Sequence, residues 1–245
     1  MKILALDLET YPHLAYTWST FKTTIGHNQI VEPARVACMS YKWIGDKGSA
    51  KITSEWEHGR EDMLLNIWEL LDEADVLLGY NNAGFDNKWL NSEFITEGFQ
   101  PPSPSRSIDL YQVIKSNTMY PSKKLAYVAP TLVADTKVTH TGFELWVKCM
   151  AGDPEALALM ESYALQDTDL LEPLYYKLRP WIKNHPVTPL YSDDEVGCPT
   201  CGSANIQWRG YYYTTASKFR RYRCNDCGKW SRVASRESTT SLRNV

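Results

Sequence analysis

The 245-residue sequence lacks any apolar run that approaches the length of a membrane span. It also lacks a secretion signal at its start, because Asp7 interrupts the first apolar run far too early. We therefore expect a cytoplasmic protein, associated with the nucleoid if it is bacterial or viral. In such a reducing compartment disulfides are rare, so metal binding is the first interpretation to consider for the six cysteines.

The sequence also lacks a strong overall charge, since its formal net charge is −3 at pH 7. This balance hides a division, because residues 197–245 carry nine Lys or Arg and two Asp or Glu. That region has a net charge of +7, which leaves about −10 on the rest of the chain. A basic region attached to an acidic body indicates an anionic partner that is held at one end.

The order of the expected elements predicts one α/β domain followed by a small second domain. Strands are expected at 2–8, 35–44, 50–56 and 75–79, with a hairpin connection at 45–48 and a long aromatic loop after the first strand. Helices are expected at 60–73, 86–97, 109–116, 123–129, 143–151 and 154–178. The prolines after this last helix predict a linker at 186–196, and the Ser/Thr-rich end predicts a flexible tail at 235–245.

Two carboxylates, Asp7 and Glu9, stand two positions apart near the end of the first expected strand. In a strand, side chains at such positions point to the same face. Two like charges that lie so close repel each other unless a cation sits between them, and a divalent metal ion is the usual solution. An isolated pair of this kind is more often a pair of solvated charges, so the interpretation depends on further carboxylates.

Two later segments of the sequence supply further carboxylates. Asp86 lies in the sequence Gly-Tyr-Asn-Asn-Ala-Gly-Phe-Asp, at a junction between an expected strand and an expected helix. Tyr163 and Asp167 are four residues apart in the last helix, so they share one helix face, whereas Asp169 points elsewhere. We interpret Asp109 as a helix cap and Asp75 as a solvated charge at a strand start.

Together, these residues resemble the three motifs of the tyrosine-containing branch of the DEDD superfamily of 3′–5′ exonucleases. The motifs are D-x-E, then N-x3-F-D with Asn81, Phe85 and Asp86, and finally Y-x3-D. The segment that ends at Asp86 is most similar to the proofreading domain of family-B DNA polymerases. The histidine branch would place its histidine at position 162, which is serine here. Over about residues 1–180, the resemblance implies a ribonuclease-H-like mixed sheet flanked by helices, which we assign to residues 1–185.

The resemblance also implies two Mg²⁺ or Mn²⁺ ions about 3.5–4 Å apart, held by Asp7, Glu9, Asp86 and Asp167. It assigns Asp7 to both ions, Glu9 and Asp167 to the ion that activates water, and Asp86 to the other ion. Tyr163 would orient the attacking water, because a phenol is a poor base at neutral pH; it could instead be a core aromatic.

The expected contacts of the terminal nucleotide are Thr10, Asn81 and Phe85, although Asn81 equally suits a turn. We expect a metal-dependent 3′–5′ exonuclease that acts on single-stranded DNA. The alternatives are an exoribonuclease, a structure-selective endonuclease on the same fold, or a binding module whose nuclease site has decayed. Because the polymerising domains of family-B enzymes have no counterpart in the sequence, the role could lie in replication, recombination, repair, nucleotide recycling or RNA trimming.

Two C-x2-C pairs, with 22 residues between them, predict a zinc ribbon over residues 197–234. The four expected zinc ligands are Cys198, Cys201, Cys224 and Cys227. Because four cysteine ligands leave no open coordination position, the zinc would be structural. The glycine after each pair permits the tight turn that such a site needs. Cys38 and Cys149 stand alone in apolar surroundings and are expected to be buried thiols.

Basic and aromatic residues alternate in the ribbon, a pattern that suits phosphate contacts combined with base stacking. Our leading phosphate contacts are Arg220, Arg221 and Arg223, with Trp208 or Phe219 available to stack a base. The aromatics could instead form the small core of the ribbon while the arginines keep it soluble. A third interpretation makes the ribbon a docking surface for replication or recombination proteins.

Overall fold

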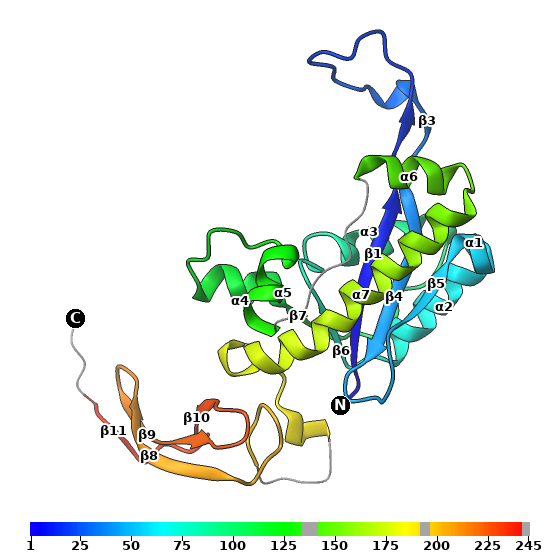
Figure 1. Ribbon diagram of the computed structural model, residues 1–245. Coiled ribbons are helices and arrows are strands. Elements are labelled where there is room, and N and C mark those ends of the chain that lie inside the picture. The colour runs from blue at the N-terminus through cyan, green and yellow to red at the C-terminus, as the bar shows by residue number, and fades with distance from the viewer. Residues whose placement is uncertain (134–141, 192–196, 242–245) are drawn as a thin grey trace. The chain divides into compact units, whose positions relative to one another are not determined.

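The computed structural model describes residues 1–133, 142–191 and 197–241, and it contains two compact units (Figure 1). One unit is Lys2–Leu174 and the other contains Tyr175–Val245, so the division falls inside the last long helix. The domain boundaries expected at residues 185, 196 and 234 stay predictions.

A five-stranded sheet with the order β5-β4-β1-β6-β7 forms the centre of the first unit. Its strands are β1 (Ile3–Tyr11), β4 (Arg35–Trp43), β5 (Lys51–Ser54), β6 (Val76–Gly79) and β7 (Arg106–Asp109). β1 runs antiparallel to β4 and parallel to β6, and β7 continues the parallel half. The mixed sheet confirms the predicted fold class.

Helices cover both faces of this sheet, and α7 crosses β1 and β4 in Figure 1. They are α1 (Glu55–His58), α2 (Arg60–Glu73), α3 (Asp86–Glu97), α4 (Leu110–Asn117), α5 (Leu125–Val133), α6 (Phe143–Met150) and α7 (Pro154–Leu178). Leu4, Leu6 and Leu8 of β1 pack with α2 and α3, whereas Tyr11 packs with α6 and α7. Among the described residues, none of the helices combines the length and the apolar content that a membrane crossing requires.

The first strand is longer than expected, which corrects the position of the two N-terminal carboxylates. The strand was predicted to end at residue 8, but β1 pairs with β4 as far as Tyr11, across a bulge after Glu9. β6, by contrast, pairs with β1 only from Ile3 to Ala5. Asp7 and Glu9 therefore lie inside β1, beyond the point where β6 leaves it.

Two further expectations were wrong. The strand predicted at 50–56 ends at Ser54, because Glu55–His58 turns into the short helix α1. β7 was not expected, since its four residues include only one large apolar side chain, Ile108. Its strand conformation comes from pairing with β6, which periodicity along the chain does not report.

The aromatic loop that follows β1 forms an arm with two short strands, β2 (Leu14–Ala15) and β3 (Ile30–Glu32). Figure 1 shows this arm extending away from the sheet. Its aromatic side chains Tyr16, Trp18 and Phe21 are exposed.

The second unit contains the ribbon, in which β9 (Ser217–Cys224) pairs with three other strands. These are β8 (Ile206–Tyr213), β10 (Trp230–Arg232) and β11 (Ser238–Thr239). β11 lies within the predicted tail, so this part of the tail pairs with the ribbon. The end of the predicted tail, 242–245, and part of the predicted linker, 192–196, lie outside the described residues.

Candidate functional site

The carboxyl ends of the three parallel strands carry acidic residues at one edge of the sheet. Asp7 and Glu9 lie in β1, Asp86 is the first residue of α3 beyond β6, and Asp109 ends β7. In open α/β sheets, this edge is where ligands bind. The sheet topology therefore brings together acidic residues that are about one hundred positions apart in sequence.

Asp7 and Glu9 share the face of the sheet that α7 covers. Their partners on β4 are Ser40 and Cys38, and Ser40 fastens α7 directly. The Ser40 hydroxyl lies 2.9 Å from the carbonyl oxygen of Ala164 and 2.6 Å from the hydroxyl of Thr168. Ala164 and Thr168 lie on either side of Asp167 in α7. Their contacts with Ser40 therefore fix the position of Asp167 relative to β4.

Tyr163 and Asp167 present the expected common helix face to these carboxylates. Burial raises the pKa of the Tyr163 hydroxyl well above its usual value, and the charges of Asp167, Glu9 and Asp7 raise it further. A hydrogen bond with Asp167 acts in the same direction. The hydroxyl therefore keeps its proton at neutral pH, and the carboxylates of β1 and α7 lie close enough to influence it.

Asp86 is hydrogen-bonded to the backbone of β1, the strand that carries Asp7 and Glu9. Its Oδ1 accepts a hydrogen bond of 3.0 Å from the backbone N–H of Leu8, which lies between Asp7 and Glu9. Burial raises the pKa of the Asp86 carboxyl to about 6, against the lowering effect of the backbone N–H donors of Asp86 and Leu8. The structure thus holds a fourth, buried carboxyl group against the segment that bears the acidic pair.

The donor set at this edge fits a hard divalent cation such as Mg²⁺ or Mn²⁺, because every candidate ligand is a carboxylate oxygen. The oxygens do not form a closed cage. Of the residues that the structure describes, only the four ribbon cysteines have ligand atoms that all lie within 4.8 Å of one another. An open arrangement of repelling carboxylates leaves coordination positions for a substrate and for water.

The three residues expected to contact a nucleotide lie beside these acids. Thr10 is in β1 next to the bulge. Asn81 has a φ of +73° and its carbonyl oxygen accepts from the N–H groups of Gly84 and Phe85, so its backbone forms the turn that its residue type also suggested. The ring of Phe85 is 38 % exposed and meets Trp89 edge-on at 6.2 Å.

Asp109 has a larger role than the helix cap that we predicted. The cap is confirmed, because Oδ1 accepts from the N–H of Gln112 at 3.3 Å. The same oxygen accepts from the N–H of Asn81 at 2.9 Å and so holds the loop that leads to Asp86. The negative charge of Asp109 also contributes to the raised pKa of Asp86.

Two polar residues that position the site were missed in the sequence. Ser40 and Thr168 are both fully buried, and their hydroxyls meet between β4 and α7. For Ser40, the signal available in the sequence was a small hydroxyl residue in the middle of an otherwise apolar strand. Asp169, as expected, points elsewhere, because its carboxylate binds the Lys42 ammonium at 3.3 Å and the N–H of Ala50 at 2.9 Å.

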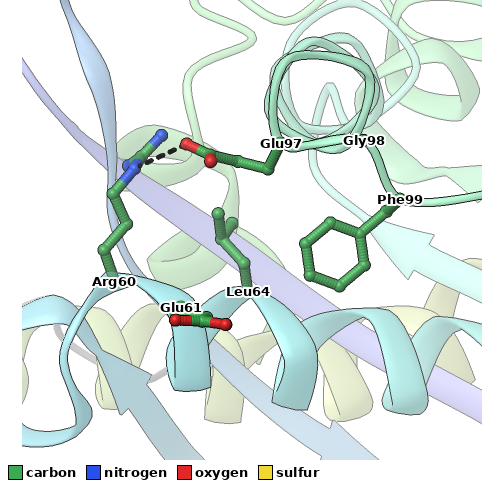
Figure 2. A pocket seen from close by; sticks show the side chains of 6 residues that line it. All are labelled: Arg60, Glu61, Leu64, Glu97, Gly98 and Phe99. Carbon is green, nitrogen blue, oxygen red and sulfur yellow. Dashed lines mark hydrogen bonds and ion pairs between the residues drawn. The ribbon is translucent and has the colours of Figure 1, made fainter.

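The pocket drawn in Figure 2 lies away from these carboxylates, between α2 and α3 on the opposite face of the sheet. Its volume is about 420 Å³. Figure 2 shows Arg60 and Glu97 directed toward each other across it, with their charged atoms 3.1 Å apart. Since these charges already satisfy each other, the pocket adds nothing to the acidic edge.

The four ribbon cysteines form the second candidate site. Sγ of Cys198 lies 3.7 Å from Sγ of Cys227, and Cys201 lies at the same distance from Cys224. Four thiolates bound tetrahedrally at about 2.3 Å from a zinc ion would be about 3.8 Å apart. Burial raises the pKa of Cys201 and of Cys227. It acts in the same direction on Cys224, but N–H donors of Cys227 and Asp226 lower the pKa of Cys224 to about 7. The thiol cluster could therefore bind one metal ion.

The other two cysteines behave as predicted. Cys38 and Cys149 are buried. Burial raises the pKa of Cys149 to about 11 and that of Cys38 well above its usual range. Both are therefore thiols that stay protonated inside the body.

The three arginines predicted to bind phosphate lie on two faces of β9. Arg221 and Arg223 share one face, because they alternate with Tyr222 along the strand. Arg220 lies on the other face, where its guanidinium stacks on the ring of Trp208 at 4.3 Å. A nucleic acid that lies along one face of the ribbon therefore contacts only part of this set.

The comparisons with known proteins agree with this architecture. Residues 33–179 match the RNase H superfamily. No curated protein matches the sequence. Among solved structures, the chain is similar to a family B DNA polymerase from the hyperthermophilic archaeon Pyrobaculum calidifontis, with 18 % identity and a TM-score of 0.55. That match covers 73 % of this chain and 24 % of the polymerase chain, so the likeness concerns the fold of one part of a much longer protein.

The superfamily match covers more than half of the chain, and it includes β4 to β7 of the mixed sheet and α7, but not β1, the strand of Asp7 and Glu9. The fold and this match support a nuclease that uses divalent metal ions and acts on nucleic acid. The chain therefore belongs to the RNase H superfamily.

Proposed function

We propose that the chain is a metal-dependent 3′–5′ exonuclease that removes nucleotides from the 3′ ends of single-stranded DNA. One observation carries the proposal: α7 brings Asp167 and the Tyr163 hydroxyl to the sheet face that bears Asp7 and Glu9. Asp86 is held against the same strand by the N–H of Leu8. The tyrosine branch of the DEDD exonucleases has the same residue types in the same order along the chain.

Asp7, Glu9, Asp86 and Asp167 are the residues that would hold two Mg²⁺ or Mn²⁺ ions. When bound, such ions supply an activated water molecule and stabilise the charge that develops on the departing oxygen. Hydrolysis would form a bond from the oxygen of a water molecule to phosphorus and break the bond to the 3′ oxygen of the preceding nucleotide, which leaves as a hydroxyl after it gains the proton that the water gives up. The product is a nucleoside 5′-monophosphate.

Tyr163 acts in this scheme as a donor and not as a base. Its pKa is raised by burial and by the neighbouring carboxylates, so its hydroxyl retains the proton. A protonated hydroxyl can donate a hydrogen bond to a water molecule and hold it in line with the scissile bond. We assign Tyr163 the orientation of the attacking water.

The terminal nucleotide has candidate contacts next to Asp86. Phe85 precedes Asp86 in the chain, and its partly exposed ring could stack on the terminal base. Asn81 is held in a fixed backbone conformation by Asp109, which leaves its side-chain amide available to the nucleotide. Thr10 lies beyond the acidic pair in β1 and completes the proposed set.

The ribbon would contribute binding rather than chemistry. Its four cysteines would hold one structural Zn²⁺, because four thiolate ligands leave no open position. Residues 197–245 carry the +7 charge excess of the chain, with Arg220, Arg221 and Arg223 among its cations. Long-range attraction and phosphate contacts from this unit would raise the affinity for a nucleic acid.

Incubation with end-labelled oligonucleotides in Mg²⁺ tests the activity, its polarity and its substrate together. On 5′-labelled single-stranded DNA we expect a ladder that shortens with time, and on 3′-labelled DNA the immediate release of a labelled mononucleotide. Excess EDTA should stop both. Faster degradation of RNA would favour the exoribonuclease, internal cuts would favour the endonuclease, and cleavage that persists in EDTA would contradict a metal-dependent reaction.

A further inference from the structure

One face of the ribbon forms a groove of about 530 Å³, a volume within the range of about 300–1,000 Å³ typical of ligand sites. Its wall includes four cations and two aromatic rings: Lys183, Arg221, Lys229, Arg232, Tyr212 and Trp230. All six residues belong to the second unit.

Strand register places most of these side chains on one face. On β10, Trp230 is paired with Arg223 and Arg232 with Arg221, while Tyr212 of β8 is paired with Phe219. Residues that are paired across neighbouring strands point to the same side of a sheet. The groove is therefore lined by the face of β9 that does not carry Arg220.

The guanidinium groups of the two arginines of the groove lie over aromatic rings. The guanidinium of Arg221 lies 4.9 Å from the ring centre of Trp230, and its Nε–H donates to the carbonyl oxygen of Arg209 at 3.1 Å. The guanidinium of Arg232 lies 3.8 Å from the ring centre of Phe219. These contacts restrict the two side chains before any ligand arrives, so less side-chain freedom is lost on binding.

The charge of the groove selects an anion. Among the residues that the structure describes, no acidic side chain lines it. Within the part of the chain that the structure describes, no ion pair involves Lys183, Arg221, Lys229 or Arg232. The Lys229 ammonium uses one donor on the carbonyl oxygen of Ile182, at 2.6 Å, and keeps the others for a ligand.

The rings distinguish between classes of anion. The side chains of Trp230 and Tyr212 are 48 % and 47 % exposed, which leaves flat apolar surface next to the cations. An inorganic anion, or a purely acidic peptide such as polyglutamate, would use the cations and gain nothing from this surface. A nucleotide uses both, because its phosphate binds the cations while its base stacks on a ring.

We propose that this groove binds one nucleotide of a single-stranded nucleic acid, with the base against Trp230 or Tyr212 and the phosphates at Arg221, Arg232, Lys229 and Lys183. The substrate class rests on the proposed nuclease function. The inference goes further in choosing one face of the ribbon and in adding five residues that the sequence analysis did not select. The opposite face, with Arg220 and Trp208, is not part of this site.

Fluorescence anisotropy with a labelled twelve-residue oligothymidylate tests the groove in the full-length chain, with Asp7→Asn as the common background to prevent degradation. Trp230→Ala should weaken binding about tenfold, because it removes a ring on which one base stacks. Trp230→Phe should restore most of the loss, since a ring is present again. Arg232→Gln should weaken binding and reduce the slope of affinity against salt by about one unit.

Matched controls lie outside the groove. Arg236→Gln removes the same charge, and Tyr213→Ala removes an exposed ring from the opposite face of β8; each should bind within about twofold of the parent. Zinc content measured for every variant confirms that the ribbon is folded. Equal binding by the groove variants and the controls, no binding by the parent, or equally strong competition by polyglutamate would each overturn the proposal.

These results separate the groove from the proposed nuclease. A wild-type chain that binds oligothymidylate through Trp230 and Arg232, but cleaves nothing in Mg²⁺, would leave the groove standing and remove the exonuclease. If instead the wild-type chain cleaves DNA and the groove variants bind oligothymidylate as tightly as the parent, the exonuclease would stand and the groove proposal would be overturned.

Discussion

We expect the acidic edge of the body and the thiol cluster of the ribbon to use metal in opposite ways. The body buries an apolar core on both faces of its sheet, with Leu4 and Met63 on one face and Tyr11 and Met160 on the other. This core can hold the carboxylates in place against their mutual repulsion. In the described part of the ribbon, the buried set is small: Cys198, Thr200, Tyr222 and Cys224. Two of these four residues, Cys198 and Cys224, are proposed metal ligands.

This difference indicates what each metal contributes. Where a core already exists, bound metal can serve chemistry, and its loss should leave the fold intact. Where the core is missing, the metal takes the place of the core, and its loss should unfold the unit. Donor chemistry follows the same division, since oxygen ligands suit labile Mg²⁺ or Mn²⁺ and four thiolates suit a tightly held Zn²⁺.

The strongest test of the acidic edge is Asp7→Asn, which preserves the size of the side chain and removes its charge. We expect cleavage to slow on the order of 1,000-fold or more, because several kcal/mol of metal-dependent stabilisation is lost. The melting temperature should not fall, since one of several repelling charges is gone. Asp169→Asn is the control, because Asp169 binds Lys42 instead of facing the site. Wild-type cleavage by Asp7→Asn would contradict the proposed site.

The converse test is Cys224→Ser in the ribbon. Metal analysis should fall from one zinc per chain to almost none, and residues 197–232 should become sensitive to protease while the body stays folded. Cleavage at saturating substrate should change little. Cys149→Ala should keep its zinc, because Cys149 is a buried thiol of the body. If Cys224→Ser retained zinc, or if the body unfolded with the ribbon, the contrast between the two sites would be lost.

A smaller effect is expected from Tyr163→Phe. The ring still packs against the cluster of Tyr11 and Met160, so stability should hardly change. Loss of the hydroxyl should lower kcat about tenfold with little change in KM, because only the orientation of the water is affected. Tyr175→Phe loses a hydroxyl that pairs with His185 in the second unit, and it should leave kcat unchanged. An unchanged kcat for Tyr163→Phe would make Tyr163 a packing residue.

The smallest effect concerns the attachment of α7. Ser40→Ala removes the hydroxyl that meets Ala164 and Thr168, and it leaves buried polar atoms without their partner. The free energy of unfolding, measured in urea, should fall by about 1–3 kcal/mol. Adding Thr168→Val should cost less than the sum of the two single changes, because both polar groups are then gone. Ser116→Ala, on exposed α4, serves as the control. Additive losses would show that the two hydroxyls do not act as a pair.

The sequence predicted the elements with strong periodicity. α2, α3 and α7 lie at the residues where spacing of apolar side chains placed them, since each helix has one face that must be buried. β5 was extended too far and β7 was missed, because both are short and draw their conformation from neighbouring strands. Strand pairing is a long-range property that a local pattern of residues does not contain.

The chemistry of the candidate sites was likewise readable in the sequence, because residue type and spacing determine which atoms can bind metal. Two C-x2-C turns imply a thiol cluster, and a D-x-E pair implies two carboxylates on one face. Only the tertiary structure decided what holds these groups. In the structure, Ser40 is hydrogen-bonded to the helix turn next to Asp167, Asp86 accepts a hydrogen bond from Leu8, and Lys183 and Trp230 line one groove. Such contacts join residues that are far apart in the chain, and they form because packing leaves each buried polar group or stacked cation one geometry that satisfies it.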